Sequence, residues 1–414
     1  MAVADLKNQF GALRMGEADY IPFNTPQHTQ QWPPGRIPRY LFRVFTPKSQ
    51  GMTNSSWTWS MDARHRSPSW ATDIFARTDR AQAANMINSH LRWWTGADDN
   101  LVSWTSSLLF ALVYVFHLRA NIRDGSEFKD ISLCMIDTKG IPDYVFIRDM
   151  DLIAAFRQES VSLQEFERLR CRQSRDFSGS YYFGEYLTQG ALKIEGRCQI
   201  ISSDLIIDAG LYHIREEFRS FADWEVRKKP PWAKPVVEMR QVFYSEKDQR
   251  RDMSSDGLEA AKAISRLLEP PWRLPMAASL VALAAPRTDD NAILVAFRSK
   301  DFTDDERESC SLEENTFAAD GTLPEVNEYK DLMQSIYNDY YLNFMKEHLY
   351  NAEIALRSIR IFTLSDDFQN HEASQATQSF SLFDVSREKV FNRLNTISFL
   401  SDILHDRLKS GREE

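Results

Sequence analysis

Cysteine is scarce in this chain of 414 residues, and its four cysteines stand far apart: Cys134, Cys171, Cys198 and Cys310. No CxxC pair occurs, so the usual spacing of a zinc site is missing and a disulfide framework is not indicated. We therefore predict reduced thiols, no bound metal and a cytoplasmic protein, with the nucleus left open as an alternative compartment.

Long apolar runs and a net positive charge are missing as well. The most apolar stretch, Leu108–Leu118, is about half of the roughly 20 residues that a membrane-spanning helix needs. The N-terminus lacks the basic segment and apolar run of a signal peptide. The formal net charge of -9 argues against a protein that binds nucleic acid through a positive face. We expect a soluble protein that binds neither membranes nor nucleic acids.

The common catalytic motifs are also lacking. The chain contains no GxxxxGK[ST] phosphate loop, no GxGxxG after a strand, no HExxH and no GxSxG. Its eight histidines are scattered singly, and we interpret His213 and His348 as packed or solvated side chains rather than metal ligands. The basic cluster Arg168–Arg175 is interpreted as a solvated helix end, with contact to an anionic ligand as the alternative.

Hydrophobic and aromatic side chains, in contrast, make up 43% and 12% of the residues. That composition is typical of a globular protein, and the length suggests two domains rather than one. We predict an α+β domain over 37–226, a Lys- and Pro-rich linker over 227–240 and an all-α domain over 241–414. Residues 1–36, polar and then rich in proline, are predicted to form a flexible arm.

Apolar periodicity predicts the individual elements. Strands are expected at 39–45, 101–105, 131–136, 192–194 and 198–201. In the first domain, helices are expected at 79–94, after Ser106 or Ser107 as the N-cap, and at 162–172, where Ser162 and Glu165 match a capping box. The C-terminal helices are expected at 257–268, 276–285, 328–363 and 385–408. The third is so long that we expect a break in it or a long hairpin arm. The Trp- and Ser-rich stretch 52–66 is expected to be a loop.

Three short motifs of the first domain place polar residues in apolar or structurally special surroundings. They are Tyr40–Phe45 (YLFRVF), Ser103–Ala111 (SWTSSLLFA) and Gly184–Leu187 (GEYL). Their order and spacing resemble a fungal domain family of unknown function that is similar to the ADP-ribosyltransferase fold. The resemblance extends over Pro38–Trp224 and implies a split β-sheet within the α+β domain.

The resemblance also implies an Arg-Ser-Glu site that takes NAD as a substrate. Arg43 would bind a phosphate or ribose through the rigid fork of its guanidinium. Ser103, or alternatively Thr105, would orient the nicotinamide ribose. Glu185 would hydrogen-bond the ribose and stabilise the positive charge that develops as nicotinamide leaves, as carboxylates do in glycoside cleavage.

Other positions either add to the resemblance or depart from the pattern of the family. Tyr181 or Tyr182 would stack on the nicotinamide, or would belong to the core. Arginine-directed family members carry Glu or Gln two residues before the catalytic Glu, where this chain has Phe183, so arginine is not the expected acceptor. Trp104 interrupts the Ser-Thr-Ser element, and Glu195 is a competing carboxylate.

Each site residue also has a purely structural explanation. Arg43 fits the polar side of an alternating strand, Ser103–Ser107 fits a strand end followed by a helix cap, and Glu185 fits a loop beside a turn glycine. The leading hypothesis is NAD-dependent ADP-ribosyl transfer to a macromolecule, or NAD hydrolysis. The alternative is a catalytically inactive module that recruits a protein partner through its helical half.

Overall fold

The computed structural model describes residues 19–25, 37–94, 98–171, 181–246, 250–287, 291–308 and 323–364, with side chains as far as residue 354. Contacts divide the chain into two compact units, Met1–Tyr341 and Leu342–Glu414. Antiparallel sheets occupy the N-terminal half and helices the C-terminal region, which confirms the predicted α+β class. No helix in these ranges has the length and apolar character needed to cross a membrane.

Six strands form the main sheet in the order β6-β7-β4-β1-β5-β9, and neighbouring strands are antiparallel. The strands are β1 Tyr40–Phe45, β4 Leu101–Thr105, β5 Ser132–Asp137, β6 Ile147–Arg148, β7 Glu185–Gln189 and β9 Cys198–Ser202. Side chains alternate along β1. Tyr40 and Phe42 join the core formed with the helices, whereas Leu41 joins a second core that contains Trp104.

The pairing between the two central strands of the main sheet is short. β1 pairs with β5 along its whole length, but its described pairing with β4 is limited to Phe42 opposite Thr105. Continuing that register would set Val44 opposite Ser103, and the described strands form no such pair. Arg43 and Ser103 lie beside this unpaired stretch of β1 and β4, which we call the opening, where backbone groups are left for partners other than a neighbouring strand.

A second sheet, β2-β3-β8, occupies much of the stretch that was expected to be a loop. Its strands are β2 Met52–Thr53, β3 Trp57–Trp59 and β8 Ala191–Lys193, and helix α2 Met61–His65 follows β3. The prediction of a loop over 52–66 is wrong because β3 pairs with β8, which is distant in sequence. Such short strands depend on tertiary pairing rather than on a local pattern.

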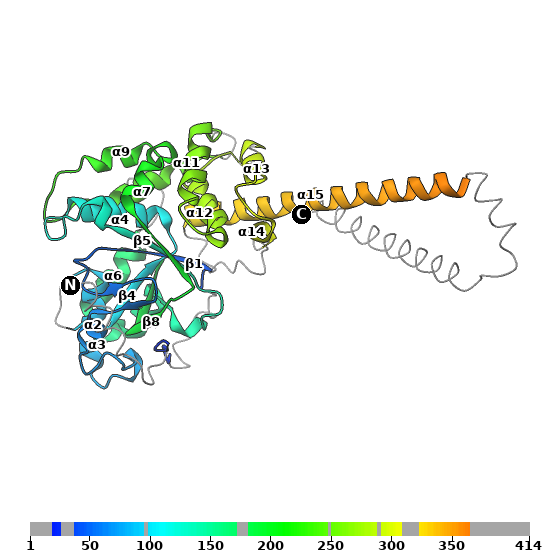
Figure 1. Ribbon diagram of the computed structural model, residues 1–414. Helices are drawn as coiled ribbons and strands as arrows, with labels where there is room; N and C mark the ends of the chain where they lie inside the picture. Colours follow the sequence, from blue (N-terminus) through cyan, green and yellow to red (C-terminus); the bar gives the residue numbers. More distant parts are fainter. Residues whose placement is uncertain are drawn as a thin grey trace, which may run out of the picture. The chain divides into compact units, whose positions relative to one another are not determined.

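The apolar helix α4, Leu108–Ala120, packs on β1 and begins at the predicted cap. The hydroxyl of Ser107 accepts a hydrogen bond from the backbone N–H of Phe110 at 3.0 Å. Helices that follow the last strand of the sheet, β9, gather beside α4 and share its core (Figure 1). These helices are α7 Ser203–Asp208, α8 Leu211–Ile214, α9 Glu217–Ala222, α10 Ala233–Met239, α11 Ser255–Ser265 and α12 Pro270–Leu283.

The segment 227–240, expected to be a linker, belongs to this core. Helix α10 occupies half of it, and both Val236 and Val237 are fully buried. Its prolines lie just before α10 and in the first turn of that helix, where proline is compatible with helical structure. The boundary between the two compact units lies after Tyr341, since the sheets and the helices as far as that residue fall in one unit.

A second group of helices packs on the β4–β7 side of the sheet: α3 Arg80–Leu91, α5 Asp149–Phe156 and α6 Val161–Cys171. Helix α6 begins one residue before Ser162, so Ser162 is not the expected cap. The backbone carbonyl of Ser160 instead accepts from the N–H groups of Leu163 and Gln164 at 3.2 Å.

The remaining helices are α13 Asn291–Phe297, α14 Asp304–Glu308 and α15 Pro324–Leu364, and short 3-10 helices are η2 Ile74–Ala76, η3 Phe128–Asp130, η4 Asp143–Val145, η5 Arg157–Glu159 and η6 Arg240–Tyr244. Helix α15 is continuous, so the expected break is not there. The predicted helix 385–408 lies outside the described residues.

Part of the predicted N-terminal arm is packed against the domain. Ile21 forms a β-bridge with Gln189, and the ring of Phe23 is 3% exposed. The backbone N–H of Phe23 also donates to the carbonyl of Tyr144 at 2.8 Å. Residues 1–18 and 26–36 of the arm lie outside the described residues.

Candidate functional site

The side chains of Arg43, Ser103 and Glu185 meet at the opening of the main sheet. The Ser103 hydroxyl lies 2.7 Å from Oε1 of Glu185. Nη1 of Arg43 donates to the backbone carbonyl of Ser103 at 3.0 Å and so bridges the gap between β1 and β4. Three residues predicted from distant motifs are therefore connected through direct contacts, with Ser103 in the middle.

Glu185 is placed by the turn that begins β7. Gly184 has a φ of +65°, which glycine adopts readily, and Glu185 is paired with Thr105 in the ladder. Thr105 is 4% exposed, and its hydroxyl donates to the carbonyl of Phe183 at 2.7 Å. Thr105, considered above as an alternative to Ser103, thus fixes the start of β7, while the Ser103 hydroxyl contacts the carboxylate.

The second oxygen of Glu185 is bound by Arg170 of α6. Nη2 of Arg170 lies 2.6 Å from Oε2, and the side chain of Arg170 is 4% exposed. The interpretation of the basic cluster as a solvated helix end is wrong for this residue; the cluster from 172 onward lies outside the described residues. Leu163 and Phe166 are buried on the same helix, and helical spacing puts Arg170 on their face, a signal that would have identified it.

Asp149, the first residue of α5, shares Arg170 with Glu185. Its carboxylate lies 3.4 Å from Nε of Arg170 and is fully buried. Burial raises the pKa of Asp149 to about 7; Arg170 opposes this shift, and the nearby charge of Glu185 adds to it. Two buried carboxylates thus depend on one guanidinium, an arrangement in which loss of the cation is costly.

His90, in the last turn of α3, contacts the other side of Ser103. Its Nε2 is 2.7 Å from the Ser103 hydroxyl oxygen, and its Nδ1 is 2.8 Å from both carboxylate oxygens of Asp99. His90 was not among the site residues predicted from the sequence. No short motif contains it together with Asp99 and Ser103, because these residues come from a helix, a loop and a strand.

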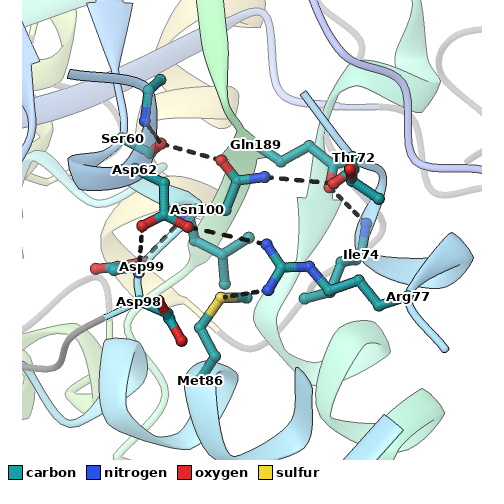
Figure 2. A network of polar contacts seen from close by, with 12 residues as sticks. Ser60, Asp62, Thr72, Ile74, Arg77, Met86, Asp98, Asp99, Asn100 and Gln189 are labelled. Atoms are coloured by element: carbon teal, nitrogen blue, oxygen red, sulfur yellow. Dashed lines mark hydrogen bonds and ion pairs between the residues drawn. The ribbon is translucent and has the colours of Figure 1, made fainter. Parts of the chain in front are cut away.

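The loop that carries Asp99 is held by a further polar network, shown in Figure 2. Asp62 of α2 accepts from the backbone N–H of Asp99 at 3.1 Å and lies 3.9 Å from Arg77. Arg77 in turn contacts the sulfur of Met86 on α3 at 3.5 Å. The network joins α2, α3 and the start of β4, so that Asp99 faces His90.

The guanidinium of Arg43 is hydrogen-bonded to a threonine of the second sheet. Its Nε donates to the hydroxyl of Thr53 at 3.1 Å, and Thr53 is hydrogen-bonded to Thr58 at 3.0 Å. Gly51 lies close by, where a Cβ atom would be 3.6 Å from Nη2 of Arg43. Burial lowers the pKa of Arg43, which still carries a positive charge at neutral pH because a free guanidinium titrates far above it.

Tyr181 and Tyr182 both lie in packed surroundings, which fits the second of the two roles expected for them. Tyr182 is 7% exposed, and Tyr181 packs against the main core. Tyr114 of α4 instead interacts electrostatically with both Arg43 and Glu185, and burial raises its pKa. Its ring lies 4.7 Å from that of Trp93, a bulky residue with a φ of 55°. Trp93 follows the C-cap of α3, where a left-handed residue commonly ends a helix, and the N–H of Trp94 donates to the carbonyl of Ser89 at 2.9 Å.

The competing carboxylate, Glu195, is exposed, and the described residues form no cluster that could bind a metal ion. Glu195 has a side-chain exposure of 63% and lies 3.9 Å from Lys193. Among the described residues, no group of three or more His, Cys, Asp or Glu side chains is arranged to hold a metal ion.

Comparison with known families matches residues 36–190 to the Domain of unknown function (DUF7587). No curated protein and no solved structure matches the chain. The matched range extends from just before β1 to the end of β7, so it contains every residue of the site described above. The site therefore lies in a domain whose activity has to be inferred from its geometry.

Proposed function

We propose that this protein cleaves NAD at its nicotinamide and either transfers ADP-ribose to a macromolecule or hydrolyses NAD. The observation that carries the proposal is the direct contact series from Arg43 through Ser103 to Glu185 at the opening of the sheet. The resemblance to the ADP-ribosyltransferase fold was based on the same three residues. Their convergence supports that resemblance.

The three side chains suit that chemistry in complementary ways. Arg43 offers a rigid cation for a phosphate or ribose of the dinucleotide. Ser103 holds Oε1 of Glu185 in place. The carboxylate of Glu185 stabilises the positive charge that grows on the ribose carbon as nicotinamide departs. Because both of its oxygens are already bound by Ser103 and Arg170, Glu185 needs no reorganisation during the reaction.

Phe183 argues against arginine as the acceptor of ADP-ribose. This residue is 2% exposed and lies in an aromatic cluster with Phe110 and Trp232. It offers no carboxylate to activate an arginine, so we propose water or a side chain other than arginine as the acceptor. The described cysteines are free thiols, which supports a cytoplasmic location.

Glu185→Gln tests this function. We expect nicotinamide release from NAD to fall on the order of 10²–10³-fold because a stabilising charge is lost. The melting temperature should stay nearly unchanged, since Gln can still accept from Ser103 and Arg170 keeps Asp149 as a partner. Glu195→Gln, on an exposed turn, is the matched control. Equal loss of activity and folding in Glu185→Gln would mark Glu185 as structural.

The second candidate function is an inactive module that recruits a protein partner. It is favoured by apolar side chains that are exposed on the described part of α15: Leu342, Leu349 and Tyr350. Calorimetric titration with NAD separates the two candidates. A heat signal that saturates below millimolar NAD supports the enzyme, and the absence of a signal supports the module.

A further inference from the structure

Four polar side chains from four elements form one continuous series of short contacts. Asp99 lies 2.8 Å from Nδ1 of His90, Nε2 of His90 lies 2.7 Å from the Ser103 hydroxyl, and that hydroxyl lies 2.7 Å from Oε1 of Glu185. All three distances are those of strong hydrogen bonds. The series connects a carboxylate in the loop before β4 to the carboxylate proposed to act on NAD.

The number of protons in this series is fixed by simple accounting. Three hydrogen bonds need three protons, and an ionised carboxylate supplies none. The Ser103 hydroxyl supplies one, so with Asp99 and Glu185 ionised all three bonds form only when His90 carries protons on both nitrogens, as it does after accepting the proton. Before that, neutral His90 leaves the Ser103 hydroxyl proton shared with only one of its two neighbours. If His90 carries only its Nδ1 proton, the three bonds persist when Glu185 holds the remaining proton. The same atoms therefore accommodate one mobile proton at either end of the Ser103 hydroxyl.

We propose that His90 and Glu185 exchange a proton through the Ser103 hydroxyl, and that His90 thereby accepts the proton released in the reaction. This inference rests on the proposed function for its chemistry. The proton passes without movement of the heavy atoms, because Ser103 gives its own proton to Nε2 as it receives one from Oε1. Asp99 stabilises the resulting imidazolium, as carboxylates that orient catalytic histidines do.

The reaction balances with the residues named. The bond between the ribose carbon and nicotinamide breaks, and its electron pair leaves with nicotinamide. The acceptor oxygen, from water or a hydroxyl, forms a bond to the same carbon, and its proton goes to Glu185. Ser103 relays a proton to His90, which ends as an imidazolium while Glu185 returns to its ionised form. No oxidant or reductant takes part.

The charges that face His90 favour this role. Asp99 approaches from the loop before β4, Glu185 from β7 and Arg43 from β1. Burial lowers the pKa of His90, but the charge and hydrogen bond of Asp99 outweigh burial, so the net pKa is raised. Arg170 and Tyr114 adjoin Glu185 rather than His90. Because the neutral form accepts the proton, the reaction should accelerate as pH rises through this raised pKa.

The first test needs no substrate. Nitrogen-15 NMR of full-length protein labelled at histidine reports the charge of His90 as a function of pH. We expect an imidazolium at pH values where free histidine is already neutral, and a lower midpoint in Glu185→Gln, which removes the negative charge that favours the imidazolium. The exposed His213 serves as the internal control. A His90 midpoint that is the same in wild type and Glu185→Gln would overturn the proposal.

The second test is the pH profile of nicotinamide release. Below the His90 midpoint, wild-type activity should rise about tenfold per pH unit. His90→Gln should lose this limb and fall on the order of 10²-fold in kcat with little change in KM, whereas His213→Gln should keep the wild-type profile. A His90→Gln profile parallel to that of wild type contradicts the relay. If wild type neither binds nor cleaves NAD, the proposed function fails, and the NMR titration still decides the proton exchange.

Discussion

At the scale of single residues, Arg170 is the cation on which the buried part of the site depends. It lies 2.6 Å from Glu185 and 3.4 Å from Asp149, and all three side chains are at most 7% exposed. We expect Arg170→Met to lower the free energy of unfolding by about 3–5 kcal/mol, because two buried carboxylates lose their shared partner. Urea unfolding measures the effect.

The matched control for Arg170 is on the same helix. Arg168 is exposed, so Arg168→Met should change the free energy of unfolding by no more than about 0.5 kcal/mol. Equal effects of the two substitutions would show that Arg170 contributes through helix propensity or surface charge rather than through its buried ion pairs.

Asp149 makes stability depend on pH with a predictable sign. Burial raises its pKa from an ordinary value of 3.8 to about 7, so between these values the folded protein binds more protons than the unfolded chain. This residue's contribution to stability is therefore present below pH 3.8 and is lost as pH rises through about 7.

Asp149→Asn should remove that dependence. Over the same pH window, the free energy of unfolding of the variant should rise relative to wild type by up to about 1.4 kcal/mol per pH unit. Urea titrations at pH 5, 6 and 7 measure the slope. Parallel curves for the two proteins would mean that Asp149 is already ionised in the folded state at pH 5.

At the scale of elements, the start of β7 depends on Gly184. Its φ is +65°, and a Cβ atom there would lie 2.2 Å from the Ser106 hydroxyl and 2.5 Å from Leu323. Gly184→Ala should lower the free energy of unfolding by more than about 1 kcal/mol, since it adds steric conflict to backbone strain. It should also reduce nicotinamide release, because Glu185 is the next residue.

Gly196→Ala introduces backbone strain without a steric conflict, so it separates the two effects that Gly184→Ala combines. Gly196 has a similar φ of +72°, and no atom lies within 4 Å of the position of its Cβ. We expect thermal unfolding to show a smaller loss for this variant and nicotinamide release to stay at the wild-type level. Similar losses in both variants would assign the effect at Gly184 to backbone strain alone.

Helices and strands with local sequence signals were predicted correctly, whereas strands that depend on distant pairing were missed. The strand predicted at 101–105 has those bounds in the structure, and the helix cap is Ser107, one of the two serines predicted for it, because both are local signals. The second sheet was missed because its strands of two or three residues exist through pairing with β8. Local periodicity carries no information about such distant pairing.

The site, too, contains residues that have a local sequence signal and residues that only the fold brings into place. Arg43, Ser103 and Glu185 were selected because each stands out in its own motif. His90 and Asp149 look ordinary in their helices, and their importance comes from what the fold brings to them: Ser103 in one case, Arg170 in the other. Arg170 is intermediate, since the helical spacing of its apolar neighbours reveals burial but not its carboxylate partners.

At the scale of the whole molecule, the helical region takes part in holding the site. Arg240 of η6 forms two contacts with Glu325 of α15, at 3.0 and 2.6 Å, and donates to the carbonyl of Tyr182 at 2.7 Å. The Ser107 hydroxyl donates to the same Glu325 at 2.6 Å. The first turn of α15 is thereby tied both to the cap of α4 and to the segment that leads into Glu185.

This arrangement predicts how the chain tolerates shortening. A chain that ends at Tyr341 keeps the whole of the first compact unit, including the contact between Arg240 and Glu325. It should unfold in a single transition with a melting temperature within about 4 °C of the full chain. A chain that ends at residue 226, the predicted domain boundary, loses α10, α11 and α12 and exposes apolar side chains of α4 and β1 to water.

The shorter chain should therefore fail to unfold cooperatively and should aggregate, because an exposed core of that size is not compatible with a stable monomer. Scanning calorimetry and size-exclusion chromatography of the two chains measure these outcomes. If the chain ending at 226 melts cooperatively and still binds NAD, the α+β domain is independent and the contacts from α10 to α15 are an interface between domains. If only the chain ending at Tyr341 does so, the helices are part of the core that shapes the site.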